Sequence, residues 1–467
     1  MAATRTVAGV RTHRPRADDF RRLVRLAVPV VFVQVGLMAM NVVDTMILGR
    51  VSAAALAGSA IGTVYIFTFG VFGMGILMAL DPIVSQSVGA QDDPAITRAL
   101  QRGLIIAAGM GIVGGLLLLP AEQVLKSLGQ PPELVAVAAP YVRVQVPSLL
   151  AFYITVVFRQ TLQALGHMRP IVITVIVANV LNALLAWAFV FGELGAPALG
   201  AMGAGLATTI ARWGMALLLV TLAWKDLGSR LRWVPEALSA RPLARMVQIG
   251  LPIGFQYLFE VGVFNAVTMI MGRLGAVTAA AHQIAINMSS LTFMVPFGVS
   301  SAASVLVGRA VGAGDGDAAR RAGIAGLIVG AGFMSVSAAV FGLAPGLLAR
   351  AYTPDPTVLA LAGTLIPIAG VFQVFDGTQV VAIGVLRGAG DTRTPLIVSL
   401  IGYWAFALPL GLWLAFRAGW GPHGLWWGLA GGLMVAALVL LARVRVRLWR
   451  RMERIAVDDH AVAIAAD

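Results

Sequence analysis

Twelve long apolar runs limit what this chain can fold into. Each run approaches or exceeds the about 20 residues that an α-helix needs to cross the hydrocarbon core of a bilayer. Charged residues make up only 12% of the chain, whereas soluble domains carry about 25%. The runs therefore predict an all-α integral membrane protein with twelve transmembrane helices. They cover residues 26–48, 55–80, 103–120, 138–165, 171–192, 202–222, 250–272, 278–308, 322–344, 358–386, 395–416 and 424–442.

The arginines indicate how these helices are oriented. The net charge is +13, and the basic residues concentrate before the first run, after the last run and in the central connection. With twelve spans these three regions lie on one side of the membrane, and the positive-inside rule makes that side the cytoplasm. We expect a plasma (inner) membrane protein whose two termini are cytoplasmic. The positive charge is then explained by the orientation of the helices in the membrane, and we expect no nucleic-acid partner.

The two halves of the sequence repeat each other. Pro29 and Pro252 lie 223 residues apart (252 − 29). The same offset pairs identical segments, TMI at 45–47 with 268–270 and VGA at 88–90 with 311–313. Six spans per half is an even number, so both halves enter the membrane from the same side. The repeat is therefore parallel, as in transporters that place a substrate site between two helical bundles.

This organisation divides the chain into five parts. They are a cytoplasmic Arg-rich tail (1–24), an N-lobe of helices 1–6 (25–223), a cytoplasmic linker (224–245), a C-lobe of helices 7–12 (246–445) and a cytoplasmic tail (446–467). The apolar stretch after the basic N-terminus is too long for a signal-peptide h-region, so we interpret it as an uncleaved first helix.

Motifs for nucleotide use or for catalysis are absent from the sequence. It contains no GxxxxGK[ST] phosphate loop, no HExxH zinc motif and no GxSxG nucleophile motif. It also contains no cysteine, which excludes thiol nucleophiles, disulfides and cysteine metal sites. We therefore expect no enzyme activity, no cofactor and no nucleotide partner.

Four acidic side chains lie within apolar stretches: Asp44, Asp81, Glu260 and Asp376. An Asp at the centre of a spanning helix costs about 2.5–3.5 kcal/mol on insertion scales, so it faces a cavity or a partner rather than lipid. At the offset of 223, Asp44, Asp81 and Glu260 correspond to Val267, Ser304 and Leu37. At the offset of 224 that aligns Gly166 with Gly390, Asp376 corresponds to Phe152. Because the shared architecture does not require them, the four acids are candidates for handling an ion or a proton.

Amide side chains accompany these acids at helical spacing. They are Gln34 and Asn41 before Asp44, Gln256 one turn before Glu260, Gln373 and Gln379 on either side of Asp376, Asn182 on the fifth helix, and Gln283 and Asn287 on the eighth. Such amides can line a substrate cleft or can hydrogen-bond between helices as structural glue. Both interpretations apply to the eighth-helix pair, and His282 beside it is better explained as structural than as a proton carrier.

Several segments resemble the multidrug and toxic compound extrusion (MATE) family in its NorM-like branch. They are PVVFVQVGLMAMNVVDTMILGR (29–50) and PIGFQYLFEVGVFNAVTMIMGR (252–273), the loop ends QSVGAQD (86–92) and GRAVGAGD (308–315), and FQVFDGTQVVAIGVLRGAGDTRTP (372–395). The resemblance covers essentially the whole chain apart from the tails. It implies two six-helix lobes around a V-shaped cleft and export of organic cations in exchange for Na⁺ or H⁺.

The resemblance also implies a role for the C-lobe acids. Glu260 and Asp376 are similar to the acidic pair that binds the coupling cation in NorM-like members. Two carboxylates that share a buried site repel each other, so a hard cation or a shared proton is required, with no structural metal. Na⁺-coupled members can have a Tyr one turn before the Asp, where this chain has Phe372. That difference favours H⁺ and leaves Na⁺ open.

In the N-lobe, Asp44 resembles the carboxylate that the family uses for coupling. The alternative is a structural Asp that hydrogen-bonds to Thr208 or Thr209 on a neighbouring helix. Asn182 matches a position in the N-lobe polar network, but Ala186 stands where the family often has Asn or Asp. The missing oxygen ligand argues against a sodium site in this lobe.

Asp81 opens the motif DPIVSQSVGA at the cytoplasmic end of the second helix. It is either a gate or a solvated acid at a helix end. With the sites above, the chain is interpreted as a monomeric antiporter in membrane lipid that moves small organic cations. The alternative is a flippase for lipid-linked oligosaccharides of the same superfamily, which would need a cationic cleft, whereas the four embedded acids are anionic.

Overall fold

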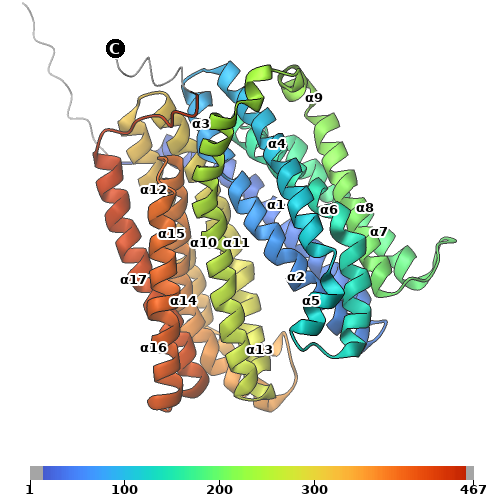
Figure 1. Cartoon of the computed structure of the whole chain (residues 1–467). Coiled ribbons are helices and arrows are strands. Elements are labelled where there is room, and N and C mark those ends of the chain that lie inside the picture. Colours follow the sequence, from blue (N-terminus) through green and yellow to red (C-terminus); the bar gives the residue numbers. More distant parts are fainter. Residues whose placement is uncertain (1–13, 459–467) are drawn as a thin grey trace, which may run out of the picture.

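The computed structural model describes residues 14–458 of the chain. Within this range twelve helical segments are long and apolar enough to cross a membrane, which confirms the predicted all-α fold class. The segments form two bundles that stand side by side (Figure 1).

The N-lobe contains the first six spans. Its helices are α1 (Ala17–Gly49), α2 (Ala53–Leu77) followed by α3 (Leu80–Gly89), α4 (Asp93–Leu118), the short α5 (Ala121–Ser127), α6 (Pro132–Leu165), α7 (Arg169–Phe191) and α8 (Ala201–Leu222). Helix α6 packs against α2, α4 and α8 and so forms the centre of the lobe. It ends at Gly166, whose φ of 81° suits the left-handed conformation that commonly closes a helix.

The C-lobe repeats this arrangement. Its helices are α10 (Ala240–Arg273), α11 (Ala276–Gly312), α12 (Gly316–Leu343), the short α13 (Pro345–Arg350), α14 (Pro356–Gly388), an eleventh span made of α15 (Arg393–Leu400), η3 (Ile401–Ala407), α16 (Leu408–Leu412) and η4 (Trp413–Arg417), and α17 (Gly421–Trp449). Helix α14 packs against α11, α12 and α17, as α6 does against α2, α4 and α8. The parallel repeat is therefore present in the packing.

The halves differ where the second span is interrupted. Met78 and Ala79 separate α2 from α3, whereas α11 runs without a break through the corresponding residues 301–302. The eleventh span also differs, because η3 and η4 are π-helical whereas α7 is α-helical throughout. The break places Asp81 in the first turn of α3.

The linker between the lobes is fastened to α4. It consists of α9 (Trp224–Leu227), η1 (Gly228–Leu231) and η2 (Pro235–Leu238) with short connections. The side chain of Gln101 donates to the carbonyls of Arg230 and Arg232 and accepts from the Val234 N–H, and Arg102 donates to the carbonyl of Glu236. These bonds hold the linker against the N-lobe.

The lobes contact each other at the end of the molecule where both described ends of the chain lie, which we call the terminal end (upper in Figure 1). Helix α1 packs on α11, α2 on α10, and α3 on α11 and α14. Glycines permit the closest approaches, since a Cβ on Gly89 would lie 1.9 Å from the Arg309 carbonyl oxygen and one on Gly312 would lie 1.9 Å from that of Gln86. Toward the other end, α1 and α2 lean away from α10 and α11 (Figure 1).

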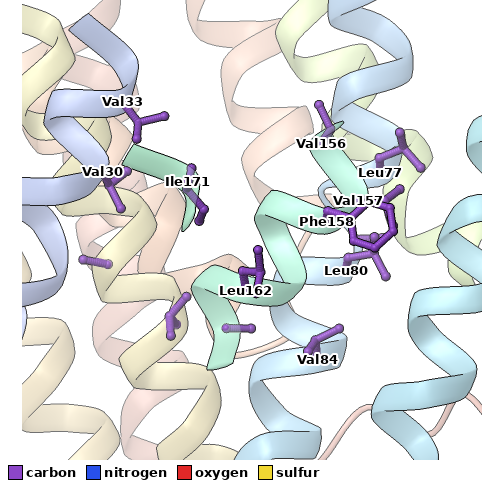
Figure 2. Close-up of a cluster of buried hydrophobic side chains, with 14 of the residues drawn as sticks. Val30, Val33, Leu77, Leu80, Val84, Val156, Val157, Phe158, Leu162 and Ile171 are labelled. Carbon is purple, nitrogen blue, oxygen red and sulfur yellow. The ribbon is translucent and has the colours of Figure 1, made fainter. Parts of the chain in front are cut away.

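Buried hydrophobic side chains fill the interior near this contact (Figure 2). Leu77 and Leu80, beside the break in the second span, lie against Val157 and Phe158 of α6, and Val30 of α1 lies near α7. The same cluster continues into α11 and α14 of the C-lobe. The two lobes therefore share one hydrophobic core at the terminal end.

Residues 450–458 follow α17 and cross from the C-lobe to the N-lobe; we call them the C-terminal strap. The strap makes five polar contacts with the N-lobe. Arg454 contacts Asp92 at 2.8 Å and Ser87 at 3.1 Å, the Ile455 N–H donates to Gln86 at 2.7 Å, and Asp458 pairs with Arg98 at 2.8 Å and Arg102 at 2.7 Å. Partial burial opposes ionisation of Asp458, but the two arginines outweigh it and hold the pKa of Asp458 below its ordinary value. The strap is therefore anchored by charge at neutral pH.

The glycine approaches lead to a stability prediction. Replacing Gly89 or Gly312 by Ala forces a methyl group into a neighbouring carbonyl, and overpacking of this kind costs about 1–3 kcal/mol. Each variant should unfold at a lower temperature than the wild type when the purified protein is heated in detergent. Gly109→Ala and Gly332→Ala form a matched control pair at the same repeat offset, with no atom within 4 Å of the added Cβ. Equal effects of the two pairs would contradict the proposed close approach.

Candidate functional site

The first candidate site is the acidic pair in the C-lobe. Glu260 on α10 is half-buried, Asp376 on α14 is 7% exposed, and the two carboxylates interact electrostatically. The hydroxyl of Tyr403, on the π-helical segment η3, interacts with the Glu260 carboxylate. The same hydroxyl accepts a hydrogen bond of 3.0 Å from the side chain of Gln379. Two carboxyl groups and a phenol hydroxyl therefore meet inside the lobe.

Amide side chains accompany this pair on the same helices. Gln256 and Gln373 are buried, and the Gln373 side-chain oxygen accepts hydrogen bonds from Thr292 and Ser337. The side-chain oxygen of Gln379 is buried and has no hydrogen-bond partner among the described residues. Oxygen atoms of this kind are the ligands that hard cations such as Na⁺ prefer. The described residues contain no group of three or more His, Cys, Asp or Glu side chains that could hold a metal, so any cation here would rely on two carboxylates and neutral oxygens.

The second candidate site surrounds Asp44 in the N-lobe. Asn182 on α7 donates to one carboxylate oxygen of Asp44 at 2.7 Å, and Thr208 on α8 donates to the other at 3.0 Å. Thr209 instead donates to the carbonyl of Val144, so of the two threonines proposed as partners only Thr208 binds the acid. Asp44 is 7% exposed and is satisfied at both oxygens.

Arg212 on α8 completes this site and was not among the residues predicted from the sequence. Its guanidinium lies over the ring of Phe152 at 5.5 Å, donates to Ser148 at 3.0 Å and interacts electrostatically with Asp44. The charge in the middle of the apolar run 202–222 was the available signal. The N-lobe acid therefore has a cation nearby, unlike the C-lobe pair.

Asp81 lies at the seam between the lobes. It is 0% exposed and forms an ion pair of 3.1 Å with Arg387 at the end of α14. The alternative of a solvated acid at a helix end is therefore wrong. Because Asp81 belongs to the N-lobe and Arg387 to the C-lobe, the pair joins the lobes at the terminal end. Arg387 also interacts with Tyr257, one turn of α10 away from Glu260.

The remaining polar candidates are distributed along the inner helices. Gln34 accepts a hydrogen bond of 3.2 Å from Arg159 on α6, a second embedded arginine that was not predicted from the sequence. Asn41 is exposed on α1. Gln283 is exposed on α11 and donates to Asn287 at 3.5 Å. His282 is buried, with Nε2 within 3.1 Å of the Thr268 hydroxyl and its ring against Trp426, which fits a packing role.

The structure thus groups the predicted residues into three places. Glu260, Asp376 and Gln379 meet through Tyr403 in the C-lobe, Asp44 and Asn182 meet in the N-lobe, and Asp81 stands apart at the seam. Tyr403 was missed because it lies in a run that looks uniformly apolar, between Gly402 and Trp404. A hydroxyl on that helix could be assigned to the site only once the packing of the eleventh span was known.

Comparison with known proteins gives the family. The MatE family model matches residues 29–188 and 252–413, two segments that begin 223 residues apart as the repeat does. A probable multidrug resistance protein NorM from Mesorhizobium japonicum is 38% identical over 94% of this chain and 95% of its own length. The multidrug resistance protein NorM of Burkholderia vietnamiensis is 36% identical over 95% and 97%.

Among solved structures, the outward-facing conformation of a multidrug resistance MATE family transporter of the MOP superfamily has the same fold. Its TM-score is 0.85 at 19% sequence identity, over 95% of this chain and 98% of that one. A two-lobed, multi-pass membrane protein of twelve helices with embedded acids in each lobe has the architecture of a carrier. The family match makes the assignment specific: the chain belongs to the MatE family.

The ion pair at the seam yields a prediction. Arg387→Met would leave Asp81 buried and without its partner, and breaking a buried pair from one side costs about 3–5 kcal/mol. The variant should lose stability in thermal unfolding of the purified protein, and the double variant Asp81→Leu/Arg387→Met should regain most of it. Arg393→Met, which removes an exposed arginine nearby, serves as the control. A double variant no more stable than the single one would contradict the pairing.

Proposed function

We propose that this chain is a secondary antiporter that exports small organic cations in exchange for Na⁺ or H⁺. Its place among the NorM proteins makes it a multidrug efflux transporter and not an enzyme. The coupling proposal rests on the C-lobe pair, Glu260 and Asp376. Among the described residues, no Lys or Arg forms an ion pair with either acid.

The C-lobe pair supplies the chemistry that coupling requires. Two nearby carboxylates in a partly buried site repel each other until a cation or a proton reduces their charge. Binding of the ion therefore changes the electrostatic energy of this site, and an ion shifts a conformational equilibrium only through such differential interaction. Tyr403 and Gln379 add neutral oxygens, so the phenol supplies the hydroxyl that Phe372 cannot. This set can hold either Na⁺ or H⁺.

Asp44 is the second coupling candidate. Both of its oxygens accept hydrogen bonds, and Arg212 interacts with it. Asp44 thus has hydrogen-bond donors and a nearby guanidinium, which suits a structural or substrate-responsive role. We therefore place primary coupling in the C-lobe.

The direction of opening follows from the basic charge. We place the terminal end in the cytoplasm of an inner-membrane protein, since the Arg-rich segments of the chain belong to that end. The lobes are then joined on the cytoplasmic side by the Asp81–Arg387 pair, the glycine approaches and the C-terminal strap. They separate toward the outside, where substrate would leave and the coupling ion would enter (Figure 1).

Transport in proteoliposomes tests the coupling site. A gradient with Na⁺ alone, or H⁺ alone, concentrated inside the vesicles should drive uptake of a fluorescent organic cation by the wild type. Asp376→Asn and Glu260→Gln should each lower the driven rate about tenfold or more, equivalent to about 1.4 kcal/mol. Glu193→Gln, which removes an exposed acid in the loop after α7, should transport as the wild type does.

Two results would revise the proposal. Full activity of both C-lobe variants with loss of activity in Asp44→Asn would move coupling to the N-lobe. If neither gradient moved an organic cation, the flippase alternative would be tested next with a fluorescent lipid-linked oligosaccharide.

The C-terminal strap must release when the cytoplasmic side opens. Arg454→Ala/Asp458→Ala removes its charged contacts, each worth about 0.2–1 kcal/mol at a partly exposed site. We expect the variant to open more often at this end. The native chain has no cysteine, so a single Ser304→Cys reporter, buried near Asp81, can be followed by maleimide labelling.

Labelling of this reporter should become about fivefold faster in the strap variant, the ratio that about 1 kcal/mol produces. The matched control Arg451→Ala/Glu453→Ala removes one positive and one negative charge from exposed positions of the same segment. Equal labelling rates in the two variants would show that the strap does not restrain the lobes.

A further inference from the structure

A pocket of about 760 Å³ lies at the terminal end, between the two lobes and apart from the coupling candidates. Helices α1 and α7 of the N-lobe and α11 and α12 of the C-lobe form its walls. Four of its lining residues are arginines: Arg22, Arg25, Arg169 and Arg309. We call this cavity the basic pocket.

The two acids that line the basic pocket, Asp19 and Asp315, already have partners other than the four pocket arginines. Asp19 accepts the Arg16 N–H at the start of α1 and pairs with Arg321 at 3.4 Å. Asp315 caps α12 by accepting the N–H of Ala318. Among the arginines, only Arg22 has an ion-pair partner in the described part of the chain, the exposed Asp18 on the preceding turn. The pocket therefore carries uncompensated positive charge.

Arg309 brings the C-lobe into this charge cluster. Its Nε and one terminal nitrogen donate to the Ala164 carbonyl near the end of α6, at 3.0 and 2.7 Å. These bonds hold the guanidinium across the seam, against the first turn after α6. Arg25 and Arg169, by contrast, are exposed and form no ion pair in the described part of the chain. The N-lobe thus contributes Arg25 and Arg169 to the pocket, and the C-lobe contributes Arg309.

The surroundings of the basic pocket are apolar on its membrane side. Leu26, Pro29 and Met168 line the pocket itself. Further along the same two helices, Val28 on α1 is 60% exposed and Ile173 on α7 is 47% exposed. Helices α1 and α7 pack against each other. Val28 lies three residues after Arg25 and Ile173 lies four residues after Arg169, so each apolar side chain follows a pocket arginine on the same face of its helix. A ligand that fits both parts has an anionic head and an acyl tail.

We propose that the basic pocket binds the phosphate headgroup of an anionic phospholipid, with its acyl chains along α1 and α7. Guanidinium groups bind phosphate oxygens in bidentate fashion, and basic pockets between helices on the cytoplasmic side are suited to anionic headgroups. Because both lobes contribute walls, a bound lipid bridges them in this conformation. Parting of the lobes at the terminal end would divide the site, so the lipid favours the state in which that end is closed.

Native mass spectrometry of the full-length protein tests this site. The protein is delipidated in detergent and titrated with cardiolipin or with phosphatidylcholine, and bound lipid is counted. The wild type should retain cardiolipin at about fivefold higher occupancy than phosphatidylcholine, and Arg25→Gln/Arg169→Gln should lower it to the phosphatidylcholine level. Arg232→Gln/Arg241→Gln removes the same charge from exposed linker-side positions and should bind as the wild type does.

Further arms separate the explanations. Arg169→Lys keeps the positive charge and should keep most of the cardiolipin binding. Arg169→Glu should abolish the preference for cardiolipin over phosphatidylcholine. This single variant replaces the double variant if the double variant does not fold. Equal loss in the control variant, or unchanged binding in the pocket variant, would overturn the proposal. Displacement of cardiolipin by millimolar inorganic phosphate would assign the pocket to a free anion instead. Transport is not measured, so failure here leaves the antiport proposal standing.

Discussion

A charge inside a membrane-spanning bundle needs a partner, and this requirement explains where the embedded charges of the protein lie. Asp81 has Arg387, and Asp44 has two hydrogen-bond donors with Arg212 nearby. Glu260 and Asp376 differ, because the charge that acts on Asp376 is that of another acid. Among the described residues, the fold therefore places two acids together without a basic partner in the C-lobe and gives such partners to the other embedded acids.

The repeat accounts for the scaffold, and the candidate site residues lie where the two halves depart from it. Gly89 and Gly312 occupy equivalent positions and approach the opposite lobe in the same way, so the seam is built symmetrically. The acids have no acidic counterparts in the other half, and η3, which carries Tyr403, has none in α7. A symmetric seam thus joins two lobes whose polar sites differ.

Much of the fold could be predicted from the sequence, because twelve apolar runs and a nearly constant offset between the halves leave few arrangements open. The sites were harder. Asp81 looked like a helix-end acid because its partner lies 306 residues away in another lobe. Arg159 and Arg212 carried a visible signal, a charge within an apolar run, yet the site prediction rested on acids and amides. Tyr403 carried no such signal, because a Tyr in a membrane helix cannot be assigned to a site until its neighbours in the structure are known.

The fastening of the linker determines how the lobes can move. Although the connection between α8 and α10 is long, its backbone is tied to Gln101 and Arg102 as far as Glu236. Only residues 237–239 remain before α10 begins at Ala240. Three extended residues span at most about 10 Å. While the linker stays tied, the C-lobe can pivot about this short joint but cannot slide far along the N-lobe, so the covalent chain itself selects rocking over translation.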